Sequence, residues 1–410
     1  MASTVKVLIV DDSVFILRTL QKMLESCPDI EVVGTALNGK EAVEKTCALK
    51  PDIVTMDIEM PVMNGIDATR IIMEVCPTPI LVISTHTTEG SQVTIDALTN
   101  GAVDFVLKNS SYNSAVLATL RDDITAKILE LARNTEFRNV LTRQKLLRNN
   151  GNHIVSASNS GSVADTPSPS LAIRVEHTAP MQPTPVQPSL QKSVHDADLL
   201  RKRPAKTDAQ IAIIGVSTGG PLSLQKVIPD LPADFPMPII IVQHMPSKFT
   251  ASLANRLDSI ARLRVKEAED GELLNAGTVY IAPGGMQMTV TRQKTVHIST
   301  EPRASLYKPS VDVLASSVHA VYGGNVLAVM MTGMGRDGAD GFKKLSQAGA
   351  YVIAQNAESC VVYGMPRAVI DEGTANDILH LDDIAHAMTD SVQTSAGAYR
   401  STRSTLISSM

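Results

Sequence analysis

Three aspartates in the first sixty residues, Asp11, Asp12 and Asp57, have the chemistry of a site for a divalent cation. Asp11 and Asp12 follow the apolar run 5–10, and Asp57 follows the apolar run 52–56. If both runs are parallel strands, their carboxyl ends lie at one edge of a sheet and the three carboxylates meet there. Carboxylates gathered in this way repel one another unless a cation joins them, and their oxygens suit Mg²⁺.

Two further polar residues end strand-like runs in the same region. Ser84 ends the run 80–83 and offers a hydroxyl, and Lys108 ends the run 103–107 and offers a cation for an anion in the crevice. A single aspartate at a strand end is usually an ordinary solvated loop residue. Five residues of fitting type at the ends of four strands favour a built site instead.

A second candidate site lies in the C-terminal half, where Ser217 follows the apolar run 211–214 among glycines. Gly215–Gly219 matches G-x-S-x-G, a motif that exposes a serine nucleophile on a sharp turn. A phosphate-binding turn or a purely structural glycine turn fits this motif equally well. His244 follows the run 238–242, which is where a general base for Ser217 would stand.

An acid completes this second constellation. Asp337 lies in a glycine-rich loop after the run 326–330 and could orient His244 and stabilise its cation. Asp337 could equally be the N-cap of a helix. The chain order Ser, His, Asp differs from the Ser, Asp, His order of α/β-hydrolases, so a trio here would belong to a different doubly wound sheet.

Both constellations need parallel strands to assemble them, and the chain predicts two such sheets. Five apolar runs alternate with helical patterns between residues 5 and 130, and a second alternation starts at residue 209. Such βαβ units build a parallel sheet covered by helices on both faces. We therefore expect an α/β protein with two doubly wound parallel-sheet domains.

A segment rich in Ser, Thr, Asn and Pro separates the two patterns. We expect residues 126–206 to form a helical extension followed by a flexible linker, because few apolar side chains there offset the entropy of ordering. The expected domains are then 1–125 and 207–392. Residues 393–410, rich in Ser and Thr, are expected to be a flexible tail.

Composition argues against several classes of function. The 410 residues carry a net charge of −5 with both signs interspersed, which gives no reason to expect nucleic-acid or anionic-membrane binding. No signal peptide and no apolar run of the ~20 residues needed to span a bilayer is recognised, so we expect no membrane insertion. The four scattered cysteines imply neither a disulfide framework nor a zinc site, so we expect a reducing, cytoplasmic location.

Residues 4–125 resemble the receiver domain of two-component response regulators, through the motifs VLIVDDS, MDIEMPVMNG, ILVIST and DFVLK. The resemblance implies a flavodoxin-like fold in which Asp57 accepts a phosphoryl group from a chemotaxis histidine kinase. Asp11, Asp12 and Asp57 would hold Mg²⁺, with help from residues 56–59.

The same resemblance assigns the residues around the acceptor. Ser84 and Lys108 would bind the phosphoryl oxygens, and Phe105 would occupy the aromatic switch position. Receivers usually have a proline after the lysine, whereas this chain has Asn109. The effect of Asn109 on the loop is therefore open, because a cis bond to a non-proline residue costs about 3 kcal/mol.

Residues 209–390 resemble the catalytic domain of the chemotaxis response-regulator protein-glutamate methylesterase/protein-glutamine glutaminase family. The resemblance rests on GVSTGGP, VQHMP, YIAPGG, YKPSVDVL, MTGMGRDGADG, GAYVIAQ and VVYGMPRAV. It implies a Rossmann-like domain with Ser217 as nucleophile, His244 as base and Asp337 as orienting acid. Thr218 and Met334 would line the oxyanion region.

The family segment that holds Tyr307, Pro309 and Ser310 lies near the implied site, with roles left open. Together the resemblances imply a phosphorylation-activated serine hydrolase that demethylates glutamate γ-methyl esters and deamidates glutamines on methyl-accepting chemoreceptors, giving sensory adaptation. The esterase step would need no cofactor. The unphosphorylated receiver would pack over the Ser217 cleft, and phosphorylation of Asp57 would weaken that packing.

Three alternatives stay open at this point. The chain could be an esterase serving a non-motility receptor array, or a signalling scaffold without hydrolysis. A DNA-binding response regulator is disfavoured, because no helix-turn-helix signal is found. The receptors, the kinase, the balance of ester to amide hydrolysis and the oligomeric state do not follow from the sequence.

Overall fold

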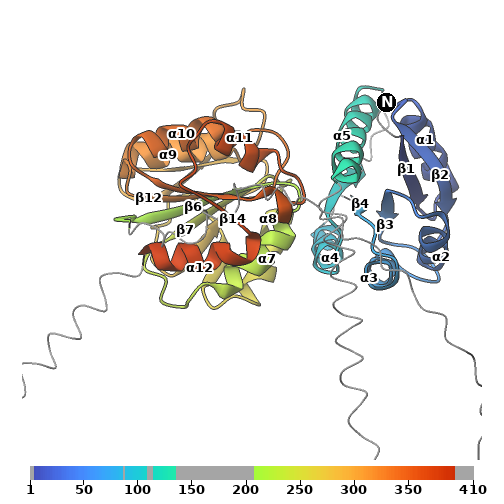
Figure 1. Cartoon of the computed structure of the whole chain (residues 1–410), viewed down its shortest axis with the longest axis horizontal. Helices are drawn as coiled ribbons and strands as arrows, with labels where there is room; N and C mark the ends of the chain where they lie inside the picture. Colours follow the sequence, from blue (N-terminus) through green and yellow to red (C-terminus); the bar gives the residue numbers. More distant parts are fainter. Residues whose placement is uncertain (1–3, 86–87, 109–113, 135–206, 393–410) are drawn as a thin grey trace, which may run out of the picture. The chain divides into compact units, whose positions relative to one another are not determined.

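The structure is a computed structural model, and it describes residues 4–85, 88–108, 114–134 and 207–392. It contains two parallel-sheet α/β domains (Figure 1), which confirms the expected fold class. Asn109, the expected linker and the expected tail lie outside the described residues.

The first domain is a five-stranded parallel sheet in the order β2-β1-β3-β4-β5. Its strands are β1 (Val5–Val10), β2 (Ile30–Ala36), β3 (Ile53–Asp57), β4 (Ile80–Thr85) and β5 (Asp104–Lys108). This is the flavodoxin-like strand order. Every residue of the central strand β3 is buried, because helices cover both faces of the sheet.

Five helices cover this sheet, with α1 and α5 on one face and α2, α3 and α4 on the other (Figure 1). Their bounds are α1 (Val14–Glu25), α2 (Gly39–Leu49), α3 (Gly65–Val75), α4 (Thr88–Thr99) and α5 (Ser114–Arg133). Helix α5 continues past residue 125, the expected end of the domain. Its residues Ile128 and Leu131 are buried in the same core as Ile9 of β1, so α5 belongs to the first domain as far as Arg133.

One expectation about the cysteines is wrong. Cys47 of α2 and Cys76, the C-cap of α3, form a disulfide with their Cα atoms 5.5 Å apart. The two residues are 29 positions apart in the chain, and only the packing of α2 beside α3 brings them together. Spacing in the sequence could not reveal this pair.

The second domain is a seven-stranded sheet in the order β14-β13-β12-β6-β7-β9-β8, in which every pairing is parallel. Its strands are β6 (Ile211–Val216), β7 (Ile239–Gln243), β8 (Arg264–Glu267), β9 (Thr278–Ile281), β12 (Val326–Met330), β13 (Tyr351–Gln355) and β14 (Asp377–Leu379). Strands β10 (Gln287–Val290) and β11 (Val296–Ser299) form a separate antiparallel hairpin. The sequence predicts strands at 211–214, 238–242, 279–281, 326–330 and 351–354, whereas β8, β14 and the hairpin were not predicted.

Helices cover both faces of the second sheet as well (Figure 1). One face carries α7 (Gly220–Asp230), α8 (Phe249–Asp258) and α12 (Leu381–Val392), and the other carries α9 (Val311–Tyr322), α10 (Ala339–Gln347) and α11 (Met365–Asp371). The strand order runs outward from β6 in both directions, to β12 on one side and to β7 on the other. Ligands of open α/β sheets bind at such a switch point, beyond the carboxyl ends of the strands.

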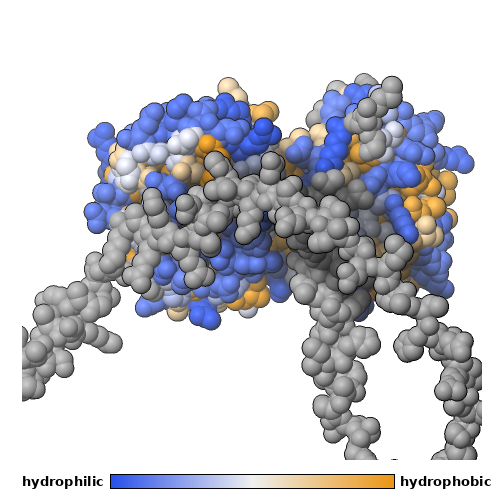
Figure 2. Space-filling view, in the orientation of Figure 1, coloured by the Kyte–Doolittle hydropathy of each residue, from blue (hydrophilic) through white to orange (hydrophobic). Residues whose placement is uncertain are grey.

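The surface of each domain agrees with this layered burial. Hydrophilic residues predominate on the face visible in Figure 2, with apolar residues scattered among them. Among the helices that the structure describes, none has the length and apolar character needed to cross a membrane.

Candidate functional site

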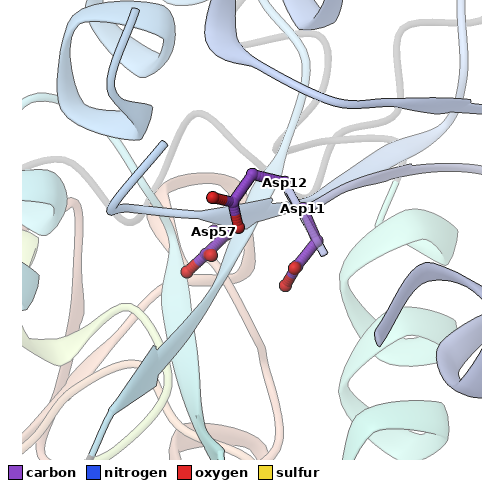
Figure 3. Close-up of side chains that lie close together, drawn as sticks. All are labelled: Asp11, Asp12 and Asp57. Atoms are coloured by element: carbon purple, nitrogen blue, oxygen red, sulfur yellow. The ribbon is translucent and has the colours of Figure 1, made fainter. Parts of the chain in front are cut away.

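The acid cluster of the first domain assembles where the sequence places it. Asp11 and Asp12 follow β1 and Asp57 ends β3, and each offers a carboxylate oxygen within 4.8 Å of the others (Figure 3). Strands β1 and β3 are adjacent and parallel, so both chain segments leave the sheet at the same edge. Asp11 and Asp57 are buried, whereas Asp12 is exposed.

Lys108 at the end of β5 is the cation of this cluster. Its Nζ lies 2.8 Å from Asp11 Oδ2 and 2.8 Å from Asp57 Oδ2. Burial raises the pKa of Asp57, and the nearby Lys108 offsets only part of this effect. Burial alone would lower the pKa of Lys108, but Asp57 and Asp11 outweigh it, and the lysine pKa is raised. One lysine cannot neutralise three carboxylates, so the donor set fits a hard dication such as Mg²⁺.

Of the two remaining residues predicted for this site, Ser84 borders the crevice and Phe105 lies on β5. The Ser84 hydroxyl is buried and is hydrogen-bonded to Thr94 of α4. Phe105 is also buried, and Lys127 Nζ lies 6.0 Å from the centre of its ring. A cavity of about 300 Å³ opens beside the acceptor, lined by Asp12, Asp57, Ile58, Glu59, Ser84, Val93 and Lys108.

In the second domain, Ser217 stands on a tight turn between β6 and α7. Its N–H donates to Thr332 O at 3.0 Å, and its own carbonyl accepts from Gly220 N at 2.8 Å. Gly219 has φ +77°, and a Cβ atom there would lie 2.4 Å from the side chain of Val361. The turn therefore needs glycine for its conformation and for space, and it leaves Ser217 half-buried.

His244 emerges beside Ser217 because their strands are paired in register. Val216 of β6 lies opposite Gln243 of β7, and the next residue on each strand is Ser217 and His244, respectively. His244 Nε2 lies 2.7 Å from Asp337 Oδ2. Its Nδ1 is buried and, among the described residues, has no hydrogen-bond partner. Nδ1 is therefore the ring atom left to accept a proton.

Asp337 is held by donors on both of its oxygens. Oδ2 accepts from Val311 N at 2.7 Å in addition to His244, and Oδ1 accepts from Ser310 Oγ at 2.8 Å and from Asp312 N at 3.2 Å. Burial would raise the pKa of Asp337, but the hydrogen bonds from His244 and the N-terminus of α9 outweigh it, and the pKa is lowered. Asp337 is thus anionic, which assigns the shared proton to His244 Nε2.

The N-cap alternative for Asp337 does not describe its position. The N-cap of α10 is Gly338, and it makes no side-chain capping bond. Asp337 lies one residue earlier, and its carboxylate is directed to the start of a different helix, α9.

The predicted oxyanion region lies on the two loops that meet at Ser217. Thr218 is buried, and its carbonyl accepts from Thr332 Oγ1 at 2.9 Å. Met334 follows Gly333, where a Cβ atom would lie 2.9 Å from the Cβ of Ser217. The backbone of this loop therefore approaches the nucleophile closely.

Sequence reasoning missed the buried side chains that fix these loops. Gln243 Nε2 donates to Ser217 O at 2.9 Å, and Gln355 Oε1 accepts from Thr332 N at 2.8 Å. Tyr307, which the resemblance placed near the site with its role left open, stacks its ring on the His244 ring with centroids 4.3 Å apart and parallel planes. A polar residue at the end of an otherwise apolar strand was the available signal for both glutamines.

Comparisons with known proteins match both domains. The CheB methylesterase family model matches residues 212–388, and the response regulator receiver domain model matches residues 7–119. Neither match includes the region between the two domains.

Curated relatives match nearly the whole chain. "Protein-glutamate methylesterase/protein-glutamine glutaminase 2" of Pseudomonas savastanoi pv. phaseolicola is 42% identical over 408 residues, covering 94% of this chain and 99% of the relative. The protein with the same name and number 3 in Pseudomonas syringae pv. syringae is 43% identical, covering 94% and 99%. The protein numbered 1 in Pseudomonas aeruginosa is 41% identical, covering 95% and 100%.

Proposed function

Because this chain belongs to the family of protein-glutamate methylesterases/protein-glutamine glutaminases, we propose that it is a serine hydrolase switched on by phosphorylation. Its substrates are glutamate γ-methyl esters, and specific glutamine amides, on the cytoplasmic part of methyl-accepting chemoreceptors. One observation carries the hydrolase assignment: a buried, anionic Asp337 bonded to His244 at the strand end beside Ser217.

Each residue of the trio has one task in the ester reaction. His244 Nδ1 takes the Ser217 proton as Oγ attacks the ester carbonyl, and Asp337 stabilises the histidine cation. Backbone donors near Thr218 and Met334 stabilise the oxyanion, at about 3–4 kcal/mol per donor in comparable sites. His244 then returns the proton to the departing methanol.

The same residues complete the cycle. His244 deprotonates a water that attacks the acyl group on Ser217, and the free glutamate leaves. With a glutamine amide at the same position, ammonia takes the place of methanol as the leaving group.

The first domain receives the signal. A chemotaxis histidine kinase supplies the phosphoryl group, and Asp57 accepts it. Asp11, Asp12 and Asp57 would hold Mg²⁺, which when bound neutralises charge on the phosphoryl oxygens. Lys108 pairs with the new dianion, and the Ser84 hydroxyl leaves Thr94 to hydrogen-bond to it. Through Thr94, a change at the acceptor reaches α4.

The unphosphorylated receiver restrains the hydrolase in this scheme, and phosphorylation releases it. Deleting residues 1–145 should therefore raise the resting rate of ester hydrolysis. A rate that stays unchanged or falls would contradict the inhibitory part of the proposal.

The hydrolase assignment is tested by methanol release from a methylated receptor fragment. The full chain should release methanol, and Ser217→Ala should not, although Asp57 of that variant still takes up phosphate from a phosphodonor. Binding of the receptor fragment without methanol release by the unaltered chain would favour the scaffold alternative.

A further inference from the structure

A buried glutamine, Gln287, connects the β10–β11 hairpin to the hydrolase site without touching the trio. Gln287 begins β10 and is 0% exposed. Its Nε2 donates to Tyr307 O at 2.7 Å, and its Oε1 accepts from Ser310 N at 2.9 Å. The two polar atoms of one amide thus hydrogen-bond to the backbone at Tyr307 and Ser310, three residues apart. A third bond, from Gly285 N to Lys308 O at 3.0 Å, holds the segment between them.

Tyr307, the first of these two residues, contacts His244, the proposed general base. Tyr307 stacks on His244 at 4.3 Å with the planes parallel. Burial first, and the nearby Asp337 carboxylate second, raise the pKa of Tyr307, so its hydroxyl stays neutral beside the site. Stacked aromatic pairs of this kind contribute modestly to stability, but they fix the plane of a ring.

Ser310, the second of these residues, hydrogen-bonds to Asp337, the orienting acid. Ser310 is the N-cap of α9, and its hydroxyl and the next two backbone N–H groups donate three of the four hydrogen bonds to Asp337. A helix N-terminus favours a carboxylate only if the carboxylate stays within reach of its first turn. The position of Ser310 therefore decides how well Asp337 is held.

We propose that Gln287 is a positioning residue of the hydrolase site, which sets the orientation of His244 through Tyr307 and of Asp337 through Ser310. The inference deepens the proposed hydrolase function and rests on it. A buried amide costs free energy unless it is hydrogen-bonded, and both polar atoms of Gln287 are used on this one segment. Loss of these two hydrogen bonds would let Tyr307 and Ser310 shift together, and these residues contact His244 and Asp337.

Gln287→Met keeps the length of the side chain and removes both bonds. We expect kcat for methanol release to fall on the order of 10- to 100-fold, the loss that attends a misplacement of about 1 Å, with KM changed by less than about threefold. Gln287→Glu keeps the acceptor for Ser310 N and loses the donor to Tyr307 O, so it should lie between Gln287→Met and the unaltered chain.

Met288→Ala is the matched control. Met288 is the next residue of β10 and is 1% exposed. Its truncation therefore destabilises the same hairpin without removing the Gln287 hydrogen bonds to Tyr307 and Ser310. Equal falls in kcat for Met288→Ala and Gln287→Met, at comparable Tm, would show that Gln287 acts through stability alone and would overturn the proposal.

A substrate-independent readout separates this inference from the proposed function. A fluorophosphonate labels an activated serine: Ser217 Oγ displaces fluoride from phosphorus while His244 takes the proton. We expect labelling of the full-length Gln287 variants to be slowed as much as kcat, and the effect of Gln287→Met to shrink in a Tyr307→Ala background. Labelling at the unaltered rate in both variants, below their Tm, overturns the role of Gln287. Absence of methanol release by the unaltered chain, with labelling intact, counts only against the substrate.

Discussion

The two crevices of this chain share one architecture, but they shift the pKa of their central aspartates in opposite directions. Both lie at the carboxyl ends of parallel strands, and both centre on a buried aspartate. In the receiver, burial raises the pKa of Asp57, and neighbouring carboxylates leave the crevice short of positive charge. In the hydrolase, burial would raise the pKa of Asp337, but hydrogen bonds from His244, Val311 and Ser310 outweigh it, and the pKa is lowered.

The difference indicates what each aspartate is for. Asp57 is destabilised as an anion, and its site is arranged to change when a phosphoryl group and a cation arrive. Asp337 is satisfied as an anion, and its site is arranged to stay fixed while His244 gains and loses a proton. Four variants test this contrast.

The largest effect is expected from the nucleophile. Ser217→Ala should lower kcat for methanol release by roughly 10⁴- to 10⁶-fold, because no other group can take over the attack on the ester. Incorporation of a phosphoryl group at Asp57 should be unchanged, which shows that the receiver is intact. Methanol release near the unaltered rate would remove Ser217 from the mechanism.

Asp337→Asn should have the next largest effect on kcat. Asparagine keeps the size of the side chain but directs an amide at groups that donate to a carboxylate, so His244 loses its tautomer and its stabilising charge. We expect a fall in kcat of about 10⁴-fold, measured by the same assay. Asp230→Asn, an exposed acid in the same domain, is the control and should leave kcat unchanged.

Lys108→Met tests the receiver side. Without the lysine, the phosphoryl group has no ion-pair partner from β5, so the ratio of methanol release with and without a phosphodonor should fall toward one. The ratio is read on the same preparation with Asp57 phosphorylation quantified. A full stimulation by phosphate in Lys108→Met would contradict the assigned role.

The smallest effects are expected on thermal stability. They test most directly the contrast between Asp57 and Asp337. At pH 7, Asp57→Asn should raise the Tm of its domain and Asp337→Asn should lower that of its own, each by about a few degrees. The gain for Asp57→Asn shrinks as pH falls toward the raised pKa, where Asp57 itself becomes protonated. The loss for Asp337→Asn shrinks as pH falls through the lowered pKa. Calorimetry from pH 7 to acid pH that gave both variants the same sign would refute the contrast.

Much of the fold followed from the sequence, because long apolar runs such as Ile211–Val216 are buried on both faces and end in polar residues. The site residues could be located for the same reason: Asp57, Ser217 and His244 each end or follow such a run. The donors to Asp337 could not be predicted, because they depend on where the loop before α9 lies. Gln287 and the pair Cys47–Cys76 also escaped, since each contact joins segments whose proximity only packing decides.

Phosphorylation at the first crevice is proposed to control hydrolysis at the second. Methanol release from a methylated receptor fragment should be measured with and without acetyl phosphate, for the full chain and for Asp57→Asn. We expect acetyl phosphate to raise the rate of the unaltered chain by about 5- to 150-fold, the range typical of coupling between sites, and to leave Asp57→Asn unaffected. An equal rise in Asp57→Asn, or no rise when Asp57 is demonstrably phosphorylated, would contradict it.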